Sequence, residues 1–472
     1  MNNMQPEFLL QSHRGERIHF IGIGGSSMRG LARLVRGQGY PVSGSDRSAS
    51  HATDKLKAEG VCVHIGHDPH NVDGAGLVVY TAAIAQDNPE LVRCRECGIP
   101  AIERAELLGQ LSAHFARSIA VCGTHGKTTV TSMLATILVQ AGLDPTVHIG
   151  GELDLLQGNV RAGQSDLFLT EACEFKASFL TLHPSLALVL NVDADHLDYY
   201  RDIDHIQATF AKFLTQVRPG GLAVLCADNE RALALREGLA CDCLSYGLDN
   251  PQADYQARDL AARDGLYFSF TPVERGEALS PVQLSVPGRL NALNALGAIA
   301  CARVLGLSME EIAPALASFR GAHRRFEHTG DVDGVQLYHD YGHNPEEYRS
   351  VVPLAAALPH GKLFVVSQPH TYSRTKALFS DYLTAFAGAD EVLVTDIYAA
   401  REKDPGDIHA TQLVEALQRK GVCATYTKDF DGTERYLRAH WKPGDVMLSL
   451  GCGNINLLNE QIQRNGNSGQ AS

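Results

Sequence analysis

Short apolar runs, each followed by a glycine turn and then by a segment of helical period, recur three times along the chain. In the first block, residues 18–23 resemble a strand and apolar residues then recur at helical spacing from Met28 to Val35. The second block begins with an apolar run at 118–121, and its helical segment, 130–141, places apolar side chains in one continuous stripe. This alternation is typical of α/β units with parallel strands.

Further apolar runs predict the remaining strands of each block. In the first two blocks they lie near Val42 and at 77–80, 167–170, 186–190 and 222–225, and in the third at 337–339, 363–366, 392–395 and 446–450. A chain of 472 residues is too long for one core, since a single core seldom grows past roughly 250 residues. We therefore expect three α/β domains, over residues 1–117, 118–321 and 322–472.

Charge and cysteine content narrow the function classes. The net charge is −13, so the chain has no overall basic field for nucleic acid or for an anionic membrane. No window approaches the roughly 20 apolar residues of a spanning helix, and residues 1–12 lack the apolar core of a secretion signal. Eleven scattered cysteines indicate reduced thiols, and the single pair Cys94 and Cys97 has no second pair at zinc-site spacing. We expect a cytoplasmic protein.

A glycine-rich loop between a predicted strand and an amphipathic helix carries the strongest chemical signal. In such a phosphate-binding loop the backbone N–H groups face phosphates, Lys127 reaches the β and γ oxygens, and the Thr128 hydroxyl holds Mg²⁺. The general motif has another glycine where this chain has Val121, so the match is to the shorter form. A turn that only caps a helix does not need a lysine and two threonines, so we predict ATP binding by Gly123, Thr124, His125, Gly126, Lys127, Thr128 and Thr129.

Polar clusters follow two later strands of the same block. Glu171 and Glu174 come after the run at 167–170, and Asp193, Asp195 and His196 come after the run at 186–190. Ligands of an open parallel sheet collect beyond the carboxyl ends of its strands, so these groups should face the phosphates. A carboxylate and an imidazole there could bind a second divalent ion, although His196 alone reads equally well as a structural histidine.

The first block also contains a glycine loop, which resembles a dinucleotide fingerprint with an acid about 22 residues further on. The glycines would admit a diphosphate at a helix N-terminus, and the acid would bind a ribose hydroxyl. The third glycine of the fingerprint is a serine here, and such a turn can also serve only to pack a helix on a sheet. The residues concerned are Gly22, Gly24, Gly25, Ser26, Ser27 and Asp46.

Taken in order, these motifs and four others resemble the Mur ligases, and most closely the branch that adds alanine. The resemblance runs from Ile18 to about Asn456 and rests on residues 19–28, 123–129, 171–174, 193–198, 291–295, 323–326, 340–345 and 368–375. It implies a Rossmann-like first domain that binds a UDP-sugar, a central ATPase-like domain with a mostly parallel sheet, and a Rossmann-like C-terminal domain that binds an amino acid. It also implies ATP-dependent joining of L-alanine to the carboxylate of UDP-N-acetylmuramate through an acyl phosphate, in peptidoglycan precursor synthesis.

The resemblance implies roles for individual residues. Lys127 would grip the β/γ-phosphates, Thr128 the first Mg²⁺, and Glu171 and His196 the second Mg²⁺ beside the acyl group. The residues that would contact ATP are Asn291, Asn294, Arg325 and Asp340. The UDP moiety would be bound by the first-block glycine loop and by Thr81, in the segment 81–84. The amino acid would be bound by Tyr341, His343 and Arg374, and the guanidinium of Arg374 is suited to its carboxylate.

Several residues of this chain depart from the pattern common in Mur ligases, and they bear on which branch of the family the chain resembles. Many Mur ligases carry a carbamylated lysine where this chain has Phe210, and the alanine-adding branch generally lacks it. Cys173, Lys176 and Thr371 also differ from residues common in the family.

The main alternative is the recycling ligase that joins a tripeptide to the same sugar nucleotide. A nicotinamide-dependent oxidoreductase would explain only the first block, and a non-catalytic nucleotide-binding regulator would not explain Glu171, His196 and Arg325 together. We expect a monomer or weak homodimer.

Overall fold

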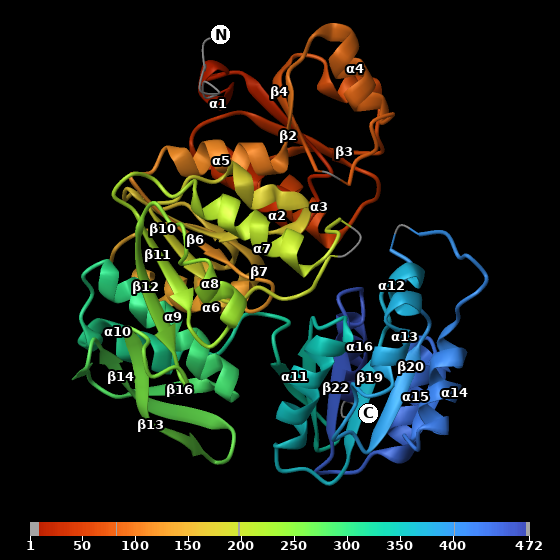
Figure 1. The fold of residues 1–472 in the computed structure, drawn as a ribbon. Helices are drawn as coiled ribbons and strands as arrows, with labels where there is room; N and C mark the ends of the chain where they lie inside the picture. Colours follow the sequence, from red (N-terminus) through yellow and green to blue (C-terminus); the bar gives the residue numbers. More distant parts are fainter. Residues whose placement is uncertain (1–8, 82, 197–198, 401, 469–472) are drawn as a thin grey trace. The chain divides into compact units, whose positions relative to one another are not determined.

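The computed structural model describes residues 9–81, 83–196, 199–400 and 402–468, and its strands form three sheets. In Figure 1 the first sheet is red to orange, the second orange to green and the third teal to blue. The chain divides into two compact units. One comprises Met1–Ala261 and Phe268–Arg320, with the first two sheets, and the other comprises Ala262–Tyr267 and Gly321–Ser472, with the third.

The first sheet is parallel and has the order β3-β2-β1-β4-β5. The segments that follow the neighbouring strands β1 and β4 pack in different cores, with Leu31 in one and Leu91 in the other, and ligands of open α/β sheets bind beyond the carboxyl ends of such a strand pair. Its strands are β1 (Arg17–Ile21), β2 (Val42–Asp46), β3 (Cys62–Ile65), β4 (Ala75–Tyr80) and β5 (Ala101–Glu103), and its helical segments are α1 (Leu9–Ser12), α2 (Ser26–Gly37), α3 (His51–Ala58), η1 (Pro69–Val72), α4 (Pro89–Cys97) and α5 (Arg104–Ala113).

The second sheet has eleven strands and is parallel through its centre, where β6 lies between β10 and β9. Its strands are β6 (Arg117–Cys122), β7 (Thr146–Leu153), β8 (Gly158–Arg161), β9 (Leu167–Ala172), β10 (Leu186–Val189), β11 (Leu222–Cys226), β12 (Asp242–Gly247), β13 (Tyr255–Arg263), β14 (Tyr267–Glu274), β15 (Glu277–Ala278) and β16 (Val282–Pro287). Its helical segments are α6 (Lys127–Gln140), η2 (Asp154–Leu156), η3 (Phe175–Thr181), α7 (Ile203–Leu214), α8 (Glu230–Ala234), α9 (Arg289–Val304) and α10 (Met309–Ser318).

The third sheet has the order β17-β18-β22-β19-β20-β21 and is parallel except at β17. Successive side chains of its central strand β19 enter different cores: Val365 packs with α11 and α14, while Phe364 and Val366 pack with α15 and α16. The strands are β17 (Glu327–Val332), β18 (Val335–Asp340), β19 (Leu363–Ser367), β20 (Glu391–Thr395), β21 (Ala424–Lys428) and β22 (Val446–Leu450), and the helices are α11 (Pro345–Ala356), α12 (Tyr372–Ala377), α13 (Phe379–Tyr382), α14 (Ala410–Arg419), α15 (Phe430–His440) and α16 (Asn456–Ser468).

The predicted three-part α/β fold with mostly parallel sheets is confirmed, and each predicted apolar run coincides with a strand, although the runs at 18–23 and 186–190 extend two residues and one residue past β1 and β10. The predicted helical stripe at 130–141 is the buried face of α6, where Met133 and Ile137 are fully covered. Antiparallel additions were not predicted: β8 pairs with β7, and β14 pairs with β15. The exact domain boundaries stay a prediction.

Two negative findings apply to the residues that the structure describes. None of their helices is long and apolar enough to cross a bilayer. None of their cysteines is paired, and burial raises the pKa of Cys94 to about 11. Cys94 and Cys97 are therefore free thiols in this fold.

Two buried histidines predict a loss of stability in acid. Burial and the nearby charge of Arg104 lower the pKa of His148 to about 3, and burial and Arg324 lower that of His339 to about 4. An unfolded histidine titrates near 6.5, so below that pH the unfolded chain binds more protons than the folded one. The free energy of unfolding therefore decreases as the pH is lowered. Each histidine should cost roughly 2 kcal/mol of unfolding free energy between pH 8 and pH 5.

Urea unfolding at the two pH values measures this effect. Replacing His148 with Gln should remove its share of the pH dependence, whereas His70→Gln, at a side chain that is 74% exposed, should leave the dependence unchanged. Equal stability of the unmodified protein at pH 8 and pH 5 would contradict the prediction.

Candidate active site

The predicted phosphate loop lies between β6 and α6, beyond the carboxyl end of the sheet. Gly123 and Gly126 have φ angles of 149° and 84°, which favour glycine. The loop is hydrogen-bonded to Asn191, two residues after β10. The backbone N–H of His125 donates to Asn191 Oδ1 at 2.8 Å, and Asn191 Nδ2 donates to the His125 carbonyl at 3.1 Å. Helix α6 begins at Lys127, so the loop opens a helix N-terminus as phosphate binding requires.

The Lys127 ammonium group folds back towards its own loop. It donates to the carbonyl oxygens of Gly123 and Thr124 and forms an ion pair with Glu174, whose two oxygens lie 3.0 and 2.8 Å from Nζ. Burial lowers the pKa of Lys127, but the charge and hydrogen bond of Glu174 together with the nearby Cys173 and Glu171 outweigh it, and the pKa lies above its ordinary value. Lys127 is therefore a held, protonated cation at the phosphate loop.

The predicted metal ligands lie at the same edge of the sheet. Glu171, on β9, accepts a hydrogen bond from the backbone N–H of Gly150 at 2.7 Å. His196 follows β10, and its Nε2 atom lies 3.7 Å from Glu174 Oε1. The Thr128 side chain is buried in the first turn of α6, where Thr129 follows it. The motif residues Leu197 and Asp198 lie outside the described residues.

The donor set suits magnesium. Within the described part of the chain, no group of three or more His, Cys, Asp or Glu side chains could hold a metal ion by itself. Mg²⁺ is usually bound by one or two carboxylates together with phosphate oxygens and water. The oxygen and nitrogen atoms of Thr128, Glu171 and His196 fit the protein share of such a shell.

The predicted nucleotide asparagines also reach the phosphate loop. Asn294, on α9, donates through Nδ2 to Asn291 Oδ1 at 3.1 Å. A Cβ atom added to Gly126 would lie 3.2 Å from Asn294 Oδ1, so this amide packs directly on the loop. Two segments about 170 residues apart in the sequence therefore form one surface.

The first-block glycine loop lies beyond the carboxyl ends of β1, β2 and β4. The N–H of Gly22 donates to the Ser45 carbonyl at 2.8 Å, and the N–H of Gly24 donates to Asp46 Oδ2 at 2.9 Å. A Cβ atom on Gly22 would lie 3.6 Å from Thr81 Cγ2. The structure thus gathers Gly22, Gly24, Asp46 and Thr81; Ala82, in the predicted segment 81–84, lies outside the described residues.

The serines after this loop connect it to the predicted metal carboxylate. Gly25 precedes α2, and Ser26 Oγ donates to the Gly150 carbonyl at 3.5 Å, while the N–H of the same glycine donates to Glu171. Asn159 Nδ2 also donates to the Ser26 carbonyl, at 3.0 Å. The proposed diphosphate loop and Glu171 therefore meet on one residue of β7.

Arg104 lies beside the predicted UDP loop and was not among the residues predicted from the sequence. Its Nη1 donates to Ser27 Oγ at 3.0 Å, and His148 Nε2 lies 3.2 Å from the same oxygen. Arg104 begins α5 directly after β5, at the carboxyl edge of the first sheet. Its position after a strand was the available signal, but β5 has only three residues and forms no recognisable apolar run.

In the second unit, Arg325 and Asp340 come together near Tyr341. Asp340 accepts hydrogen bonds from the N–H groups of Phe326 and Gly342, and burial raises its pKa against the opposing charge of Arg325. The guanidinium groups of Arg324 and Arg325 lie 4.7 and 5.4 Å from the centre of the Tyr341 ring, and that of Arg324 also donates to His339 and to two backbone carbonyls.

The predicted amino-acid residues form a continuous group in the second unit. Tyr341 contacts His343 edge to face, with ring centres 5.8 Å apart, and His343 contacts His370 in the same way. Arg374 Nη1 lies 3.3 Å from His370 Nδ1, and the His370 ring stacks on Tyr398. His370 was not predicted as a site residue, although it lies in the motif segment 368–375; it joins His343 to Arg374.

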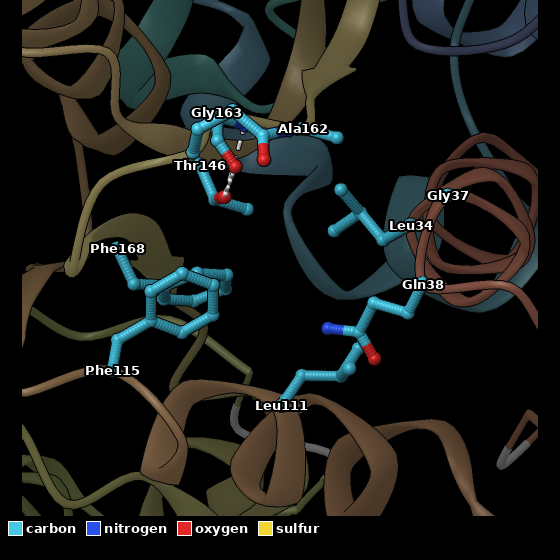
Figure 2. Close-up of a pocket in the computed structure, with 10 residues that line it drawn as sticks. Leu34, Gly37, Gln38, Leu111, Phe115, Thr146, Ala162, Gly163 and Phe168 are labelled. Atoms are coloured by element: carbon cyan, nitrogen blue, oxygen red, sulfur yellow. Dashed lines mark hydrogen bonds between the residues drawn. The ribbon is translucent and has the colours of Figure 1, made fainter. Parts of the chain in front are cut away.

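A cavity of about 310 Å³ lies at the opposite end of the second sheet. Figure 2 shows the rings of Phe115 and Phe168 facing Leu34 of α2 and Gln38, the residue after α2, across it. Phe115 precedes β6 and Phe168 lies near the start of β9, so this cavity is at the amino ends of strands whose carboxyl ends carry the phosphate loop. It is separate from the candidate active site.

Three parts of the chain match family models. Residues 17–116 match the Mur ligase family catalytic domain, residues 121–302 the Mur ligase middle domain, and residues 324–453 the glutamate ligase domain of Mur ligases. The matches follow one another through most of the chain and cover all three sheets except the first four residues of β6.

Full-length relatives and solved structures agree with these matches. The chain is 42% identical to a UDP-N-acetylmuramate–L-alanine ligase of Acetivibrio thermocellus over 97% of this chain and 98% of that one, and 44% identical to one of Clostridium acetobutylicum over 96% and 99%. The crystal structure of UDP-N-acetylmuramate-alanine ligase MurC from Thermotoga maritima superposes with a TM-score of 0.83 at 27% identity, covering 96% of this chain and 100% of that one. A murein peptide ligase from Psychrobacter arcticus has the same fold, with a TM-score of 0.73 at 24% identity over 95% and 98%.

Proposed function

The chain belongs to the Mur ligase family, and from that premise we propose that it joins L-alanine to the carboxylate of UDP-N-acetylmuramate with consumption of ATP. The carrying observation is the full-length similarity to relatives that bear this name, at 42% and 44% identity. The reaction would occur in the cytoplasm, during peptidoglycan precursor synthesis. The partners are the two small-molecule substrates, and the protein acts as a monomer or weak homodimer.

The proposed chemistry needs positive charge around two clustered anions. ATP transfers its γ-phosphoryl group to the muramyl carboxylate, the amino group of alanine attacks the acyl phosphate, and an amide, ADP and phosphate result. Lys127, held at the phosphate loop, would offset charge on the β/γ-phosphates, and Arg325 would stabilise the transferred group. Asn291 and Asn294 would contact the nucleotide, and Asp340 its ribose.

Magnesium is part of this proposal. Thr128 would hold one ion, and Glu171 and His196 a second near the acyl group. When bound, Mg²⁺ supplies charge neutralisation between phosphate and carboxylate oxygens. The connection of Glu171 to Ser26 through Gly150 supports the proposal, because it links the predicted metal carboxylate to the loop proposed for the UDP moiety.

The sugar nucleotide and the amino acid are assigned to different groups of residues. Gly22, Gly24, Gly25, Ser26, Ser27, Asp46 and Thr81 would bind the UDP moiety, with Arg104 as an added cation beside Ser27. Tyr341, His343 and Arg374 would hold alanine, with the guanidinium of Arg374 on the amino-acid carboxylate.

The decisive experiment measures phosphate release by the purified full-length protein. With ATP, Mg²⁺ and UDP-N-acetylmuramate present, we expect turnover with L-alanine and at least about 100-fold slower turnover with L-alanyl-γ-D-glutamyl-meso-diaminopimelate, the substrate of the recycling ligases. Such a ratio corresponds to about 2.7 kcal/mol of transition-state discrimination.

Controls separate this activity from simple ATP hydrolysis. Phosphate release should require both the sugar nucleotide and the amino acid, and the product should be one alanyl residue heavier by mass spectrometry. Turnover with the tripeptide alone would move the protein to the recycling branch, and hydrolysis independent of the sugar nucleotide would contradict ligase function.

A further inference from the structure

Glu174 is a buried carboxylate beside the phosphate loop that the proposed reaction leaves without a role. It follows β9 and is 2% exposed. Both of its oxygens approach Lys127 Nζ, at 3.0 and 2.8 Å, and Oε1 is 3.7 Å from His196 Nε2. Its backbone carbonyl accepts a hydrogen bond from the hydroxyl of the buried Tyr200, which fixes the turn that carries it.

The hydrogen-bonding capacity of Lys127 is filled in this arrangement. An ammonium group has three N–H donors, and here the acceptors are the carbonyls of Gly123 and Thr124 and the carboxylate of Glu174. A phosphate oxygen can therefore accept from Lys127 only after one of these acceptors gives way or shares its donor. Of the three, Glu174 alone carries a full negative charge, like the incoming phosphate, so it is the acceptor that the phosphate replaces most directly.

Charge balance gives the same answer. Lys127 and Glu174 are both largely removed from water, and a buried ion left without its partner is strongly destabilising. Without nucleotide, Glu174 neutralises Lys127; with nucleotide, the phosphates supply that negative charge. If both anions stayed on the same cation, their mutual repulsion would weaken nucleotide binding.

We propose that Glu174 is the resting-state counter-ion of Lys127 and that the phosphates of the bound nucleotide displace it. Glu174 is thus a positioning residue: it keeps the empty phosphate loop neutral and correctly folded, and it competes with ATP for the same ammonium group. The proposal rests on the proposed function, because it takes a nucleoside polyphosphate as the ligand of the loop.

The test compares Glu174→Gln with the unmodified protein. The variant leaves Lys127 without a counter-ion in the empty site, so its Tm without ligand should fall. Added ADP should raise its Tm by more than it raises that of the unmodified protein. By isothermal titration calorimetry the variant should bind ADP about tenfold more tightly, because the competing anion is gone.

Three controls separate this role from a structural one. Adenosine, which has no phosphate, should bind both proteins equally. Glu174→Asp keeps the charge and should remain within about threefold of the original ADP affinity. Glu90→Gln changes another fully buried carboxylate of the same unit, bonded to His67, Ser45 and Asn71, and should lower Tm without changing the ADP-induced shift.

The outcomes are distinguishable from those of the proposed function. If Glu174→Gln binds ADP no more tightly than the unmodified protein, or gains no more Tm from ADP, the counter-ion exchange is wrong while the ligase proposal stands. If the unmodified protein itself does not bind ADP, the proposed function fails at its first step.

Discussion

Replacing Lys127 with methionine is expected to lower kcat/KM for ATP by about 10³-fold, because the enzyme loses the cation that meets charge developing on the transferred phosphoryl group. Methionine keeps most of the side-chain volume and removes the charge. The ammonium group lies within the loop, held by Gly123, Thr124 and Glu174. Phosphate release with UDP-N-acetylmuramate and L-alanine measures the loss.

A second variant excludes damage to the fold as the cause. Lys127→Met alone leaves Glu174 as an unpaired buried carboxylate, which is destabilising by itself. The double variant Lys127→Met and Glu174→Gln leaves no unpaired charge, so it should recover thermal stability and stay inactive. Lys212→Met, at an exposed position of α7 in the same unit, should keep full activity. More than a tenth of the original activity in the double variant would show that Lys127 is not essential.

The strand pattern predicted where the site lies, because a parallel sheet brings the carboxyl ends of its strands to one edge. The loop at 123–129 follows β6, Glu171 lies near the carboxyl end of β9, and Asn191 follows β10. These strands are buried on both faces, so each appears in the sequence as an uninterrupted apolar run. The position of the phosphate loop was therefore available from sequence alone.

The outer strands of the second sheet were not predictable in the same way. β13 is exposed over most of its length, and β7 contains Gly150 and Gly151, which interrupt the apolar pattern. β15 has only two residues. Such strands form because neighbouring strands supply hydrogen bonds, and that tertiary cause leaves little trace in the local sequence.

The role of Glu174 depended on backbone geometry that the sequence does not display. Lys176 and Ala177 both have positive φ, at 51° and 56°, and they bend the segment that follows β9. In the sequence Glu171 and Glu174 are two acids of one short motif, and either could face the phosphates. The structure assigns them different neighbours: Glu171 accepts from Gly150, and Glu174 pairs with Lys127.

The amino-acid group shows the same division between motif and geometry. Tyr341 and His343 follow β18, whereas Arg374 lies on α12 after β19, and the resemblance alone grouped them. The structure adds the reason for their association, since His370 contacts both His343 and Arg374. Aromatic contacts between segments about 30 residues apart cannot be inferred from spacing.

Replacing Arg374 with lysine is expected to raise KM for L-alanine by about 100-fold while KM for ATP and for UDP-N-acetylmuramate stays within about twofold. A guanidinium offers two parallel N–H donors to a carboxylate, whereas an ammonium group acts as a point charge. Arg374 Nη1 lies 3.3 Å from His370 Nδ1, so the side chain is oriented by a ring that lysine cannot engage in the same way. Initial rates of phosphate release, with each of the three substrates varied in turn while the other two are saturating, give the three KM values.

A substrate without a carboxylate makes the assignment specific. L-alaninamide keeps the attacking amino group and lacks the negative charge, so the unmodified protein should strongly prefer L-alanine, and Arg374→Ala should lose most of that preference. Arg349→Lys changes an arginine of the same unit that pairs with Glu346 at the surface, and it should leave KM for alanine unchanged. If Arg374→Ala still discriminates between L-alanine and its amide as the unmodified protein does, another group binds the carboxylate. Arg374 would then act only by packing against His370, because its charge would contribute nothing to selection of the amino acid.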